Sequence, residues 1–495
     1  MNKSEQLNKG SIGLVGLTII SMAGVLAIIG PMEVASFIGT SGPAAMWPVI
    51  LGFILFLVVS LPILEYTKIT TFAGGYYGLA ELGFGRAVGK YTSMTNYVFY
   101  LFWQTTNFFA MSAIIIDTLQ VLYGITIPIW GWILLGTMII LVTNVMGGLH
   151  PGRLSKILIA ITTITTLVVV VFIIFVIIKT PYNSFSLLNP SNSYSGFKGI
   201  AAGTAIYGFF LYVGYGTTLF FSEESVNGRK DVWRSVYLGL GLSAIVIALS
   251  AYSEVASVPA SQFGTVSSAI LPELVTWIHY IPAYALLILN LFVVVVSMLS
   301  FGAGAGAQSR LLWAMTRDGF IKNKWLNTLS KKNRTPVNSI IFQFIIILFM
   351  AFSIAVIMVH FYGYNLATIT TAWFVCGSAG TILWYFHHFI PEFGLFPFLN
   401  KNSEIKYSIF RKWVIGLALP IGGTVLFIYT FYLGIVSDLA EPYFAFLIVD
   451  VIILLVIFAF IVYKVKTKSM GGSAIEYMVA ESQENIDSAG SGGSK

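Results

Sequence analysis

Long apolar runs recur from one end of this chain to the other, and no soluble fold could bury so many of them. About 20 consecutive apolar residues cross a bilayer as a helix. Of the 495 residues, 57% are hydrophobic and only 9% are charged, whereas soluble domains usually carry about 25% charged residues. The short alternating segments of a transmembrane barrel are absent. We therefore predict an all-α integral membrane protein.

Polar breaks between the apolar runs predict twelve transmembrane helices, which places both termini on one side of the membrane. The predicted spans are 11–38, 43–65, 87–120, 126–147, 155–179, 198–222, 233–257, 280–307, 336–360, 363–388, 411–434 and 441–463. A short cytoplasmic N-terminus (1–10) precedes them. A disordered cytoplasmic tail (464–495) follows, and its last residues, GSGGSK, look like an appended linker.

The distribution of basic residues predicts the orientation. With a cytoplasmic N-terminus, all of the 27 lysines and arginines except Lys179 and Lys198 fall on the cytoplasmic side, as the positive-inside rule requires. The net charge of +7 therefore reflects topology and contact with anionic lipids of the bilayer, not binding to nucleic acid. We expect a multi-pass protein of the plasma membrane with both termini in the cytoplasm.

Motifs of enzyme chemistry are missing from the sequence. It contains no GxxxxGK[ST] phosphate loop, no HExxH, no GxSxG and a single cysteine, Cys376, so we predict neither an enzyme nor a bound metal or other cofactor. The adjacent His387 and His388 point apart on a helix. We expect them to anchor at the membrane interface, and we expect Arg310 to be interfacial too.

Two predicted spans carry residues that break helices. The first contains Gly24 and Gly30-Pro31, and the sixth contains Gly208, Gly214 and Gly216. Transporters use such discontinuous helices, at matching positions of two inverted repeats, to hold substrate near the membrane midplane. The alternative is that these residues only kink the helices or allow close packing.

Three motifs then resemble the amino acid–polyamine–organocation (APC) superfamily. FFLYVGYGTTLFFSEESVNGRKDVWRSV (209–236) is similar to its FxFxGFE…AEExxNPxRxIPRAI signature. SRLLWAMTRDGFIKN…RTPVNS (309–339) is similar to its SRxLYAxARDGxxP…TPxxA stretch. FAGGYYGLAELGFG (72–85) resembles the loop between helices 2 and 3.

The resemblance implies a LeuT-like fold of 5+5 inverted repeats, here 11–180 and 198–388, followed by two further helices at 411–463. It also implies a substrate site on the broken backbones of helices 1 and 6. By position, the gating aromatic is Phe210 and the unwound segment is Leu211, Tyr212, Val213 and Gly214. In helix 1 the candidates are Ala23-Gly24 and Ile28-Ile29-Gly30, and the spacing to Ser41-Gly42-Pro43-Ala44 favours the second.

Coupling to an ion has two candidate sites. Thr162 stands where some proton-coupled relatives carry a lysine, and with Ser297 and Ser300 it could form a sodium-type site, although hydroxyls also join helices to each other. Glu33 would face the vestibule if span 1 is broken at Gly30, which makes it a candidate proton site. We therefore expect Na⁺ or H⁺ as the coupling ion.

The third span contributes polar side chains at helical spacing. These are Asn96, Tyr100, Trp103, Gln104 and Asn107, which could line the substrate path or pack against other spans. Gly216 replaces an acid that many relatives carry, and no acid lies securely at the site. A neutral amino acid is therefore preferred over a dicationic amine.

The predicted function is secondary active transport of amino acids by alternating access. The alternatives are a sensor with a transporter-like fold, a carrier of amines or polyamines, and a channel. The short tail argues against a sensor, and a channel is disfavoured because no ring of charges or repeated pore loop occurs. The expected partners are the substrate and the lipid bilayer, with the chain acting as a monomer or homodimer.

Overall fold

A computed structural model describes residues 7, 9–69, 72, 74–208, 210–402, 407–432 and 442–476, without the side chains of Ile206 and Phe210. Within these ranges the regular structure is helical, and its one β-type pairing is an isolated bridge between Ile12 and Ser225.

Ten helices of the described chain are long and apolar enough to span a membrane. They are α4 (Met46–Thr67), α6 (Arg86–Tyr123), α7 (Ile129–Gly147), α8 (Pro151–Lys179), α10 (Gly228–Ser257), α13 (Ala283–Arg317), α14 (Val337–Tyr362), α15 (Leu366–Lys401), a span formed by α16 (Ile409–Trp413), η10 (Val414–Ala418) and α17 (Leu419–Phe431), and α18 (Tyr443–Lys466). An eleventh is a bent pair, α1 (Leu14–Val25) with the segment Ala27–Glu33, whose two parts meet at 48°.

Shorter helices lie between the spans. They are η2 (Ala27–Ile29), α2 (Gly30–Glu33), α3 (Ala35–Ser41), η3 (Gly42–Ala44), α5 (Tyr76–Phe84), η4 (Phe185–Leu188), η5 (Pro190–Asn192), α9 (Phe197–Gly203), η8 (Ala260–Gln262), α11 (Phe263–Ser267), α12 (Pro272–Thr276) and η9 (Trp277–His279).

The predicted span 198–222 is not a regular α-helix. It begins as α9, continues as a π-helical turn, η6 (Thr204–Gly208), and then becomes a 3₁₀ helix, η7 (Phe210–Glu224). Runs of 3₁₀ helix longer than about four residues are uncommon and often mark a hinge or a strained segment. The structure thus supports a multi-pass membrane protein with ten or eleven apolar spans among the described residues, while the sixth predicted span, 198–222, is irregular.

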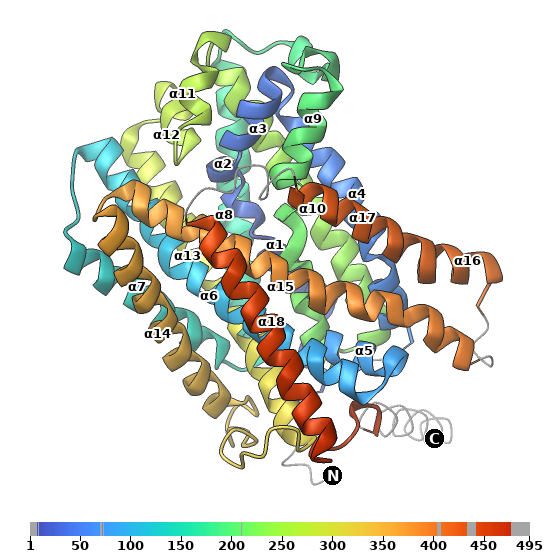
Figure 1. Ribbon diagram of the computed structural model, residues 1–495. Coiled ribbons are helices and arrows are strands. Elements are labelled where there is room, and N and C mark those ends of the chain that lie inside the picture. The colour runs from blue at the N-terminus through green and yellow to red at the C-terminus, as the bar shows by residue number, and fades with distance from the viewer. Residues whose placement is uncertain are drawn as a thin grey trace, which may run out of the picture.

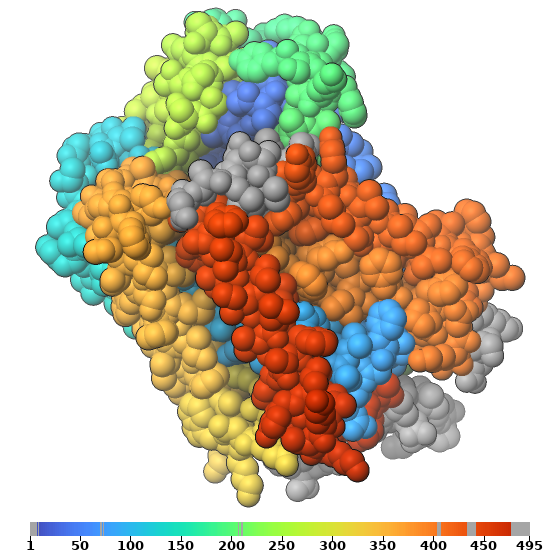
Figure 2. Space-filling model, viewed as in Figure 1, coloured from blue at the N-terminus to red at the C-terminus, as the bar shows by residue number. Residues whose placement is uncertain are grey.

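The helices form one bundle, and the first and last described segments lie at the same end of it (Figure 1). We call this end, which holds α5 and the end of α18, the terminal end. The opposite end, which holds α3, α9, α11 and α12, is the distal end. Helices α14 and α18 cover one face of the bundle (Figure 2). Their outward side chains, such as Phe349 and Leu455, are apolar and exposed, as contact with lipid requires.

The first part of the tail, expected to be disordered, is folded in the structure. The Gly471 carbonyl accepts a hydrogen bond of 2.9 Å from Arg86 Nη1, and the Ala474 amide donates one of 3.2 Å to Glu81 Oε1. Ala474 is fully buried. Residues 471–474 therefore pack on α5 and the start of α6, and 477–495 lie outside the described chain.

Candidate substrate site

The first spanning helix is broken at Leu26. Helix α1 ends at Val25, and Leu26 adopts the left-handed conformation, with φ 58°. A non-glycine residue seldom adopts this conformation. The Leu26 amide donates to the Ala23 carbonyl at 3.0 Å, and the chain then restarts as η2 and α2. The break thus lies between the two positions that the sequence offered, Gly24 and Ile28–Gly30.

Two glycines bring the backbones of α1 and η7 into contact. A Cβ atom added to Gly214 would overlap the Gly24 carbonyl oxygen, and one added to Gly24 would overlap the Gly214 carbonyl oxygen. Only glycine permits such an approach. Gly30, by contrast, packs against α10, where an added Cβ would lie 3.2 Å from Ile247 Cα.

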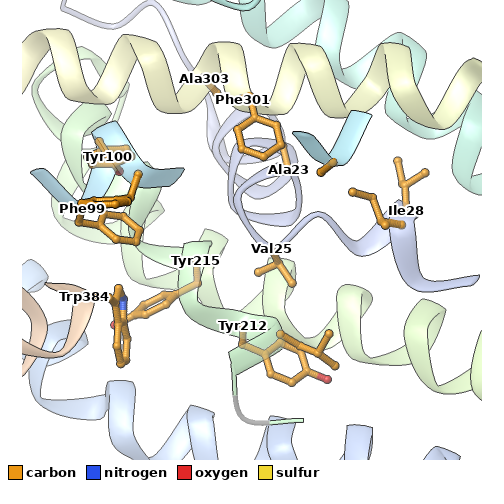
Figure 3. Packing of buried hydrophobic residues seen from close by; sticks show 14 of the residues in the cluster. Ala23, Val25, Ile28, Phe99, Tyr100, Tyr212, Tyr215, Phe301, Ala303 and Trp384 are labelled. Atoms are coloured by element: carbon orange, nitrogen blue, oxygen red, sulfur yellow. The ribbon is translucent and has the colours of Figure 1, made fainter. Parts of the chain in front are cut away.

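A cavity of about 700 Å³ lies beside this backbone contact. Its volume is within the range of small-molecule sites, about 300–1,000 Å³. It runs from Gly24 and Gly214 toward the distal end, where Ser267 at the end of α11 and residues 268–270 of the loop before α12 contribute to its wall. Figure 3 shows Phe99, Tyr100 and Phe301 near the end of α1.

The wall of the cavity is mainly aromatic and aliphatic. Trp103 of α6 and Phe301 of α13 lie with ring centroids 4.4 Å apart, and Trp373 and Phe374 come from α15. Glu33 is the one charged residue among the described residues that line it, and it forms a side-chain hydrogen bond with Tyr207. Such a wall suits a ligand with an apolar side chain.

About half of the predicted substrate residues line this cavity. They are Gly24, Ile29, Leu211, Val213 and Gly214, together with the predicted ion-coupling residue Glu33. Ile28 and Tyr100 each line a smaller neighbouring cavity. The side chain of Phe210, the predicted gate, lies outside the described part of the chain.

Two predicted residues instead join helices to one another. The Tyr212 hydroxyl donates to the Val49 carbonyl of α4 at 3.1 Å. Gln104 Nε2 donates to the Phe301 carbonyl at 2.8 Å. Asn96 is buried and is not part of the cavity wall. The polar face of α6 is therefore largely a packing face.

The three hydroxyl residues predicted for an ion site do come together. Thr162, Ser297 and Ser300 line a cavity of about 10 Å³ beside Ala23, Leu26 and Ile28 at the break of α1. Thr162 Oγ1 and Ser297 Oγ have no hydrogen-bond partner among the described residues, whereas Ser300 Oγ donates to the Val296 carbonyl. The space is about that of one water molecule.

Ion pairs close the bundle at the terminal end. Arg310 Nε lies 2.7 Å from Glu224 Oε2, and Arg310 Nη2 lies 3.1 Å from Glu224 Oε1. Arg310 is only 1% exposed, so the expectation that it is interfacial was wrong. Glu223 lies 3.7 Å from Arg317, which is on α13 like Arg310.

A third pair adds to this closure. Lys90 Nζ lies 2.5 Å from Asp318 Oδ2, and the Tyr77 hydroxyl donates to the same oxygen. Burial raises the pKa of Asp318, against the opposing effect of the Lys90 ammonium. Like Glu224–Arg310, this pair is buried and joins α13 or the residue that directly follows it to another part of the bundle.

Sequence reasoning missed the aromatic wall and misplaced two histidines. Phe99, Phe301 and Trp373 stand among many other aromatic residues in the spans, so the sequence carried no signal that they face a cavity. His387 and His388, expected at the membrane interface, are both buried, at 1% and 0% exposure.

Comparisons with known proteins support one family. No curated protein matches the chain. The family model described as amino acid permease matches residues 10–458, which is most of the chain and includes every element of the cavity wall. This protein therefore belongs to the amino acid permease family of the APC superfamily.

Proposed function

We propose that the protein is a secondary active transporter that carries a neutral amino acid by alternating access. The observation that carries this proposal is the backbone contact between Gly24 and Gly214 beside the cavity of about 700 Å³. Broken helices expose backbone groups that can bind the carboxylate and amine of an amino acid. The aromatic wall would receive its side chain, with Phe210 as the gate that the family resemblance implies.

The positive-inside distribution supports a cytoplasmic location for the terminal end. The cavity wall reaches the distal end, while ion pairs close the terminal end. On this topology the structure corresponds to an outward-facing state. The same proposal includes the LeuT-like inverted repeats, with the irregular segment 198–222 counted as a further membrane span.

Counterflow in proteoliposomes tests the proposal. Vesicles loaded with one unlabelled amino acid should take up the same labelled amino acid, and uptake should saturate. A panel of neutral, acidic and basic amino acids, with a diamine as a further member, would identify the substrate class. Binding without flux would show a sensor, non-saturating flux would show a channel, and uptake of the diamine alone would show an amine carrier.

The coupling ion is tested in the same vesicles with imposed gradients. Sodium dependence that is lost in Thr162→Val and Ser297→Ala would place Na⁺ at the small cavity near the α1 break. Proton dependence that is lost in Glu33→Gln would place the proton site in the main cavity. An unchanged ion dependence in these variants excludes both sites.

A further inference from the structure

Three buried side chains link η7 to α15 beyond the cavity wall. The Tyr215 hydroxyl lies 2.6 Å from His388 Nε2, and His388 Nδ1 lies 2.6 Å from Glu392 Oε1. All three residues are 0% exposed. We call them the Tyr215–His388–Glu392 triad. Because Tyr215 directly follows Gly214, the triad connects the α1–η7 contact to α15.

Aromatic rings enclose the triad and exclude water from it. The His388 ring centroid lies 4.3 Å from that of Trp384 and 5.3 Å from that of Tyr76. Figure 3 shows Tyr215 and Trp384 next to each other. Despite the short contact between them, His388 Nδ1 and both oxygens of the Glu392 carboxyl lack a hydrogen bond of normal geometry among the described residues.

The groups around the triad bring no compensating charge. The titratable groups that face it are Tyr76 of α5, with Tyr100 of α6 behind it, Tyr237 of α10, and Tyr385 and His387 of α15. Among the described residues, no lysine, arginine or aspartate acts on it electrostatically. The charge of the triad is therefore set by its own protons.

The contacts of the triad allow two protonation states. In the first, the Tyr215 hydroxyl donates to His388 Nε2, His388 carries its hydrogen on Nδ1 next to the Glu392 carboxylate, and the triad carries a charge of −1. In the second, the His388–Glu392 pair holds one added proton, and the triad is neutral.

We propose that this triad is the proton-binding site that couples transport to a proton gradient. An uncompensated carboxylate is costly in a dry interior, so the enclosed triad holds its proton while the terminal end is closed. Opening that end would hydrate the carboxylate and release the proton there. Because Tyr215 follows Gly214 in η7, the same proton acts on the segment that contacts α1. This inference rests on the proposed transport function.

Proton-driven uptake in proteoliposomes tests the proposal. With an imposed difference of about one pH unit, a carrier moving one proton per substrate supports about tenfold accumulation, since both correspond to about 1.4 kcal/mol. Glu392→Gln and His388→Gln should lose this accumulation while still performing counterflow. Glu392→Asp, which restores a carboxyl group, should recover part of it.

His387→Gln is the matched control, because His387 neighbours His388 but its Nδ1 faces only the Leu383 carbonyl, at 3.1 Å. It should keep the proton-driven accumulation that His388→Gln loses. Infrared difference spectra of the wild-type protein give a second readout: a protonated carboxyl band that disappears at high pH and is absent in Glu392→Gln.

Three outcomes would overturn the proposal: normal proton-driven accumulation in Glu392→Gln, equal losses in the His387 and His388 variants, or no protonated carboxyl band assignable to Glu392. If Glu392→Gln fails to fold, Tyr215→Phe tests the same site. An unchanged pH dependence of uptake by Tyr215→Phe would also refute the proposal. An absence of counterflow in the wild-type protein would instead refute the transport function itself.

Discussion

At the scale of single residues, the glycines in the middle of two spanning segments have a steric explanation. Gly24 and Gly214 each lack a side chain where the other's carbonyl oxygen lies. At Gly216 the space is filled differently, because the Tyr76 hydroxyl lies where a Gly216 side chain would be. Each of these glycines lowers the stability of its helix, and each allows a close contact that a side chain would block.

Gly214→Ala should abolish substrate binding and counterflow, because its methyl group would push η7 away from α1. Gly241→Ala in α10 is the control, since nothing lies within 4 Å of an added Cβ there. It should be neutral or stabilise the helix by up to about 1 kcal/mol. Substrate affinity measured by binding to both purified variants checks the prediction, which equal affinities would contradict.

Arg310→Met should lower stability by about 3–5 kcal/mol, because Glu224 would stay buried without its partner. Arg317→Met is the matched comparison on the same helix. Its partner Glu223 lies 3.7 Å away, and both side chains are partly exposed, so a loss below about 1 kcal/mol is expected.

Unfolding in detergent measures the free energy of unfolding of both single variants. The double variant Glu224→Gln/Arg310→Met should regain part of the stability that Arg310→Met loses. If the double variant regains no stability, the two residues act independently.

At the scale of elements, hydropathy located most spans but not their internal breaks. The ranges of α4, α7, α8 and α14 follow the predicted runs closely, because a spanning helix must be apolar over its length. The break at Leu26 was not predicted, since leucine carries no sequence signal for the left-handed conformation. Likewise, the sequence of an apolar helix face does not show whether that face contacts lipid, another helix or a cavity. The cavity positions of Phe301 and Trp373 could therefore not be predicted.

The short helix α12 makes the stability of the distal end depend on pH. Burial raises the pKa of Glu273 from 4.5 to about 8 in the folded protein. The folded state therefore binds this proton more tightly than the unfolded state, and its stabilising effect is lost as the pH rises from 4.5 to about 8. The slope is up to about 1.4 kcal/mol per pH unit.

Glu273→Gln should make the unfolding temperature in detergent depend less on pH between 4.5 and about 8. It should also stabilise the protein near the upper limit of this pH range. Glu476→Gln, at an exposed position near the C-terminal end of the described chain, should keep the wild-type slope. An unchanged slope in Glu273→Gln would mean that its carboxyl is already ionised in the folded protein.

At the scale of the whole molecule, the two ends of the bundle differ in how they are closed. The cavity wall reaches the loop between α11 and α12 at the distal end. The terminal end is closed by Glu224–Arg310, by Lys90–Asp318 and by the folded residues 470–476. On the proposed alternating-access mechanism, the contacts of α5, α13 and the tail would separate at the terminal end while the cavity closes toward the distal end.

Cysteine labelling can follow this exchange, because the single native cysteine, Cys376, is buried and can be removed as Cys376→Ala. In that background, Ala269→Cys in the cavity wall should react quickly with an impermeant maleimide from the distal side, and substrate should slow the reaction. Ser222→Cys is buried at the terminal end, where its hydroxyl accepts from the Phe72 amide. It should react from that side only during turnover. Thr467→Cys, exposed after α18, reports full access from the terminal side.

Comparing intact cells with inside-out vesicles also tests the orientation: Thr467→Cys must label only in inverted vesicles. If Ser222→Cys reacts as fast as Thr467→Cys without substrate, the terminal end is open at rest, and the outward-facing assignment is wrong.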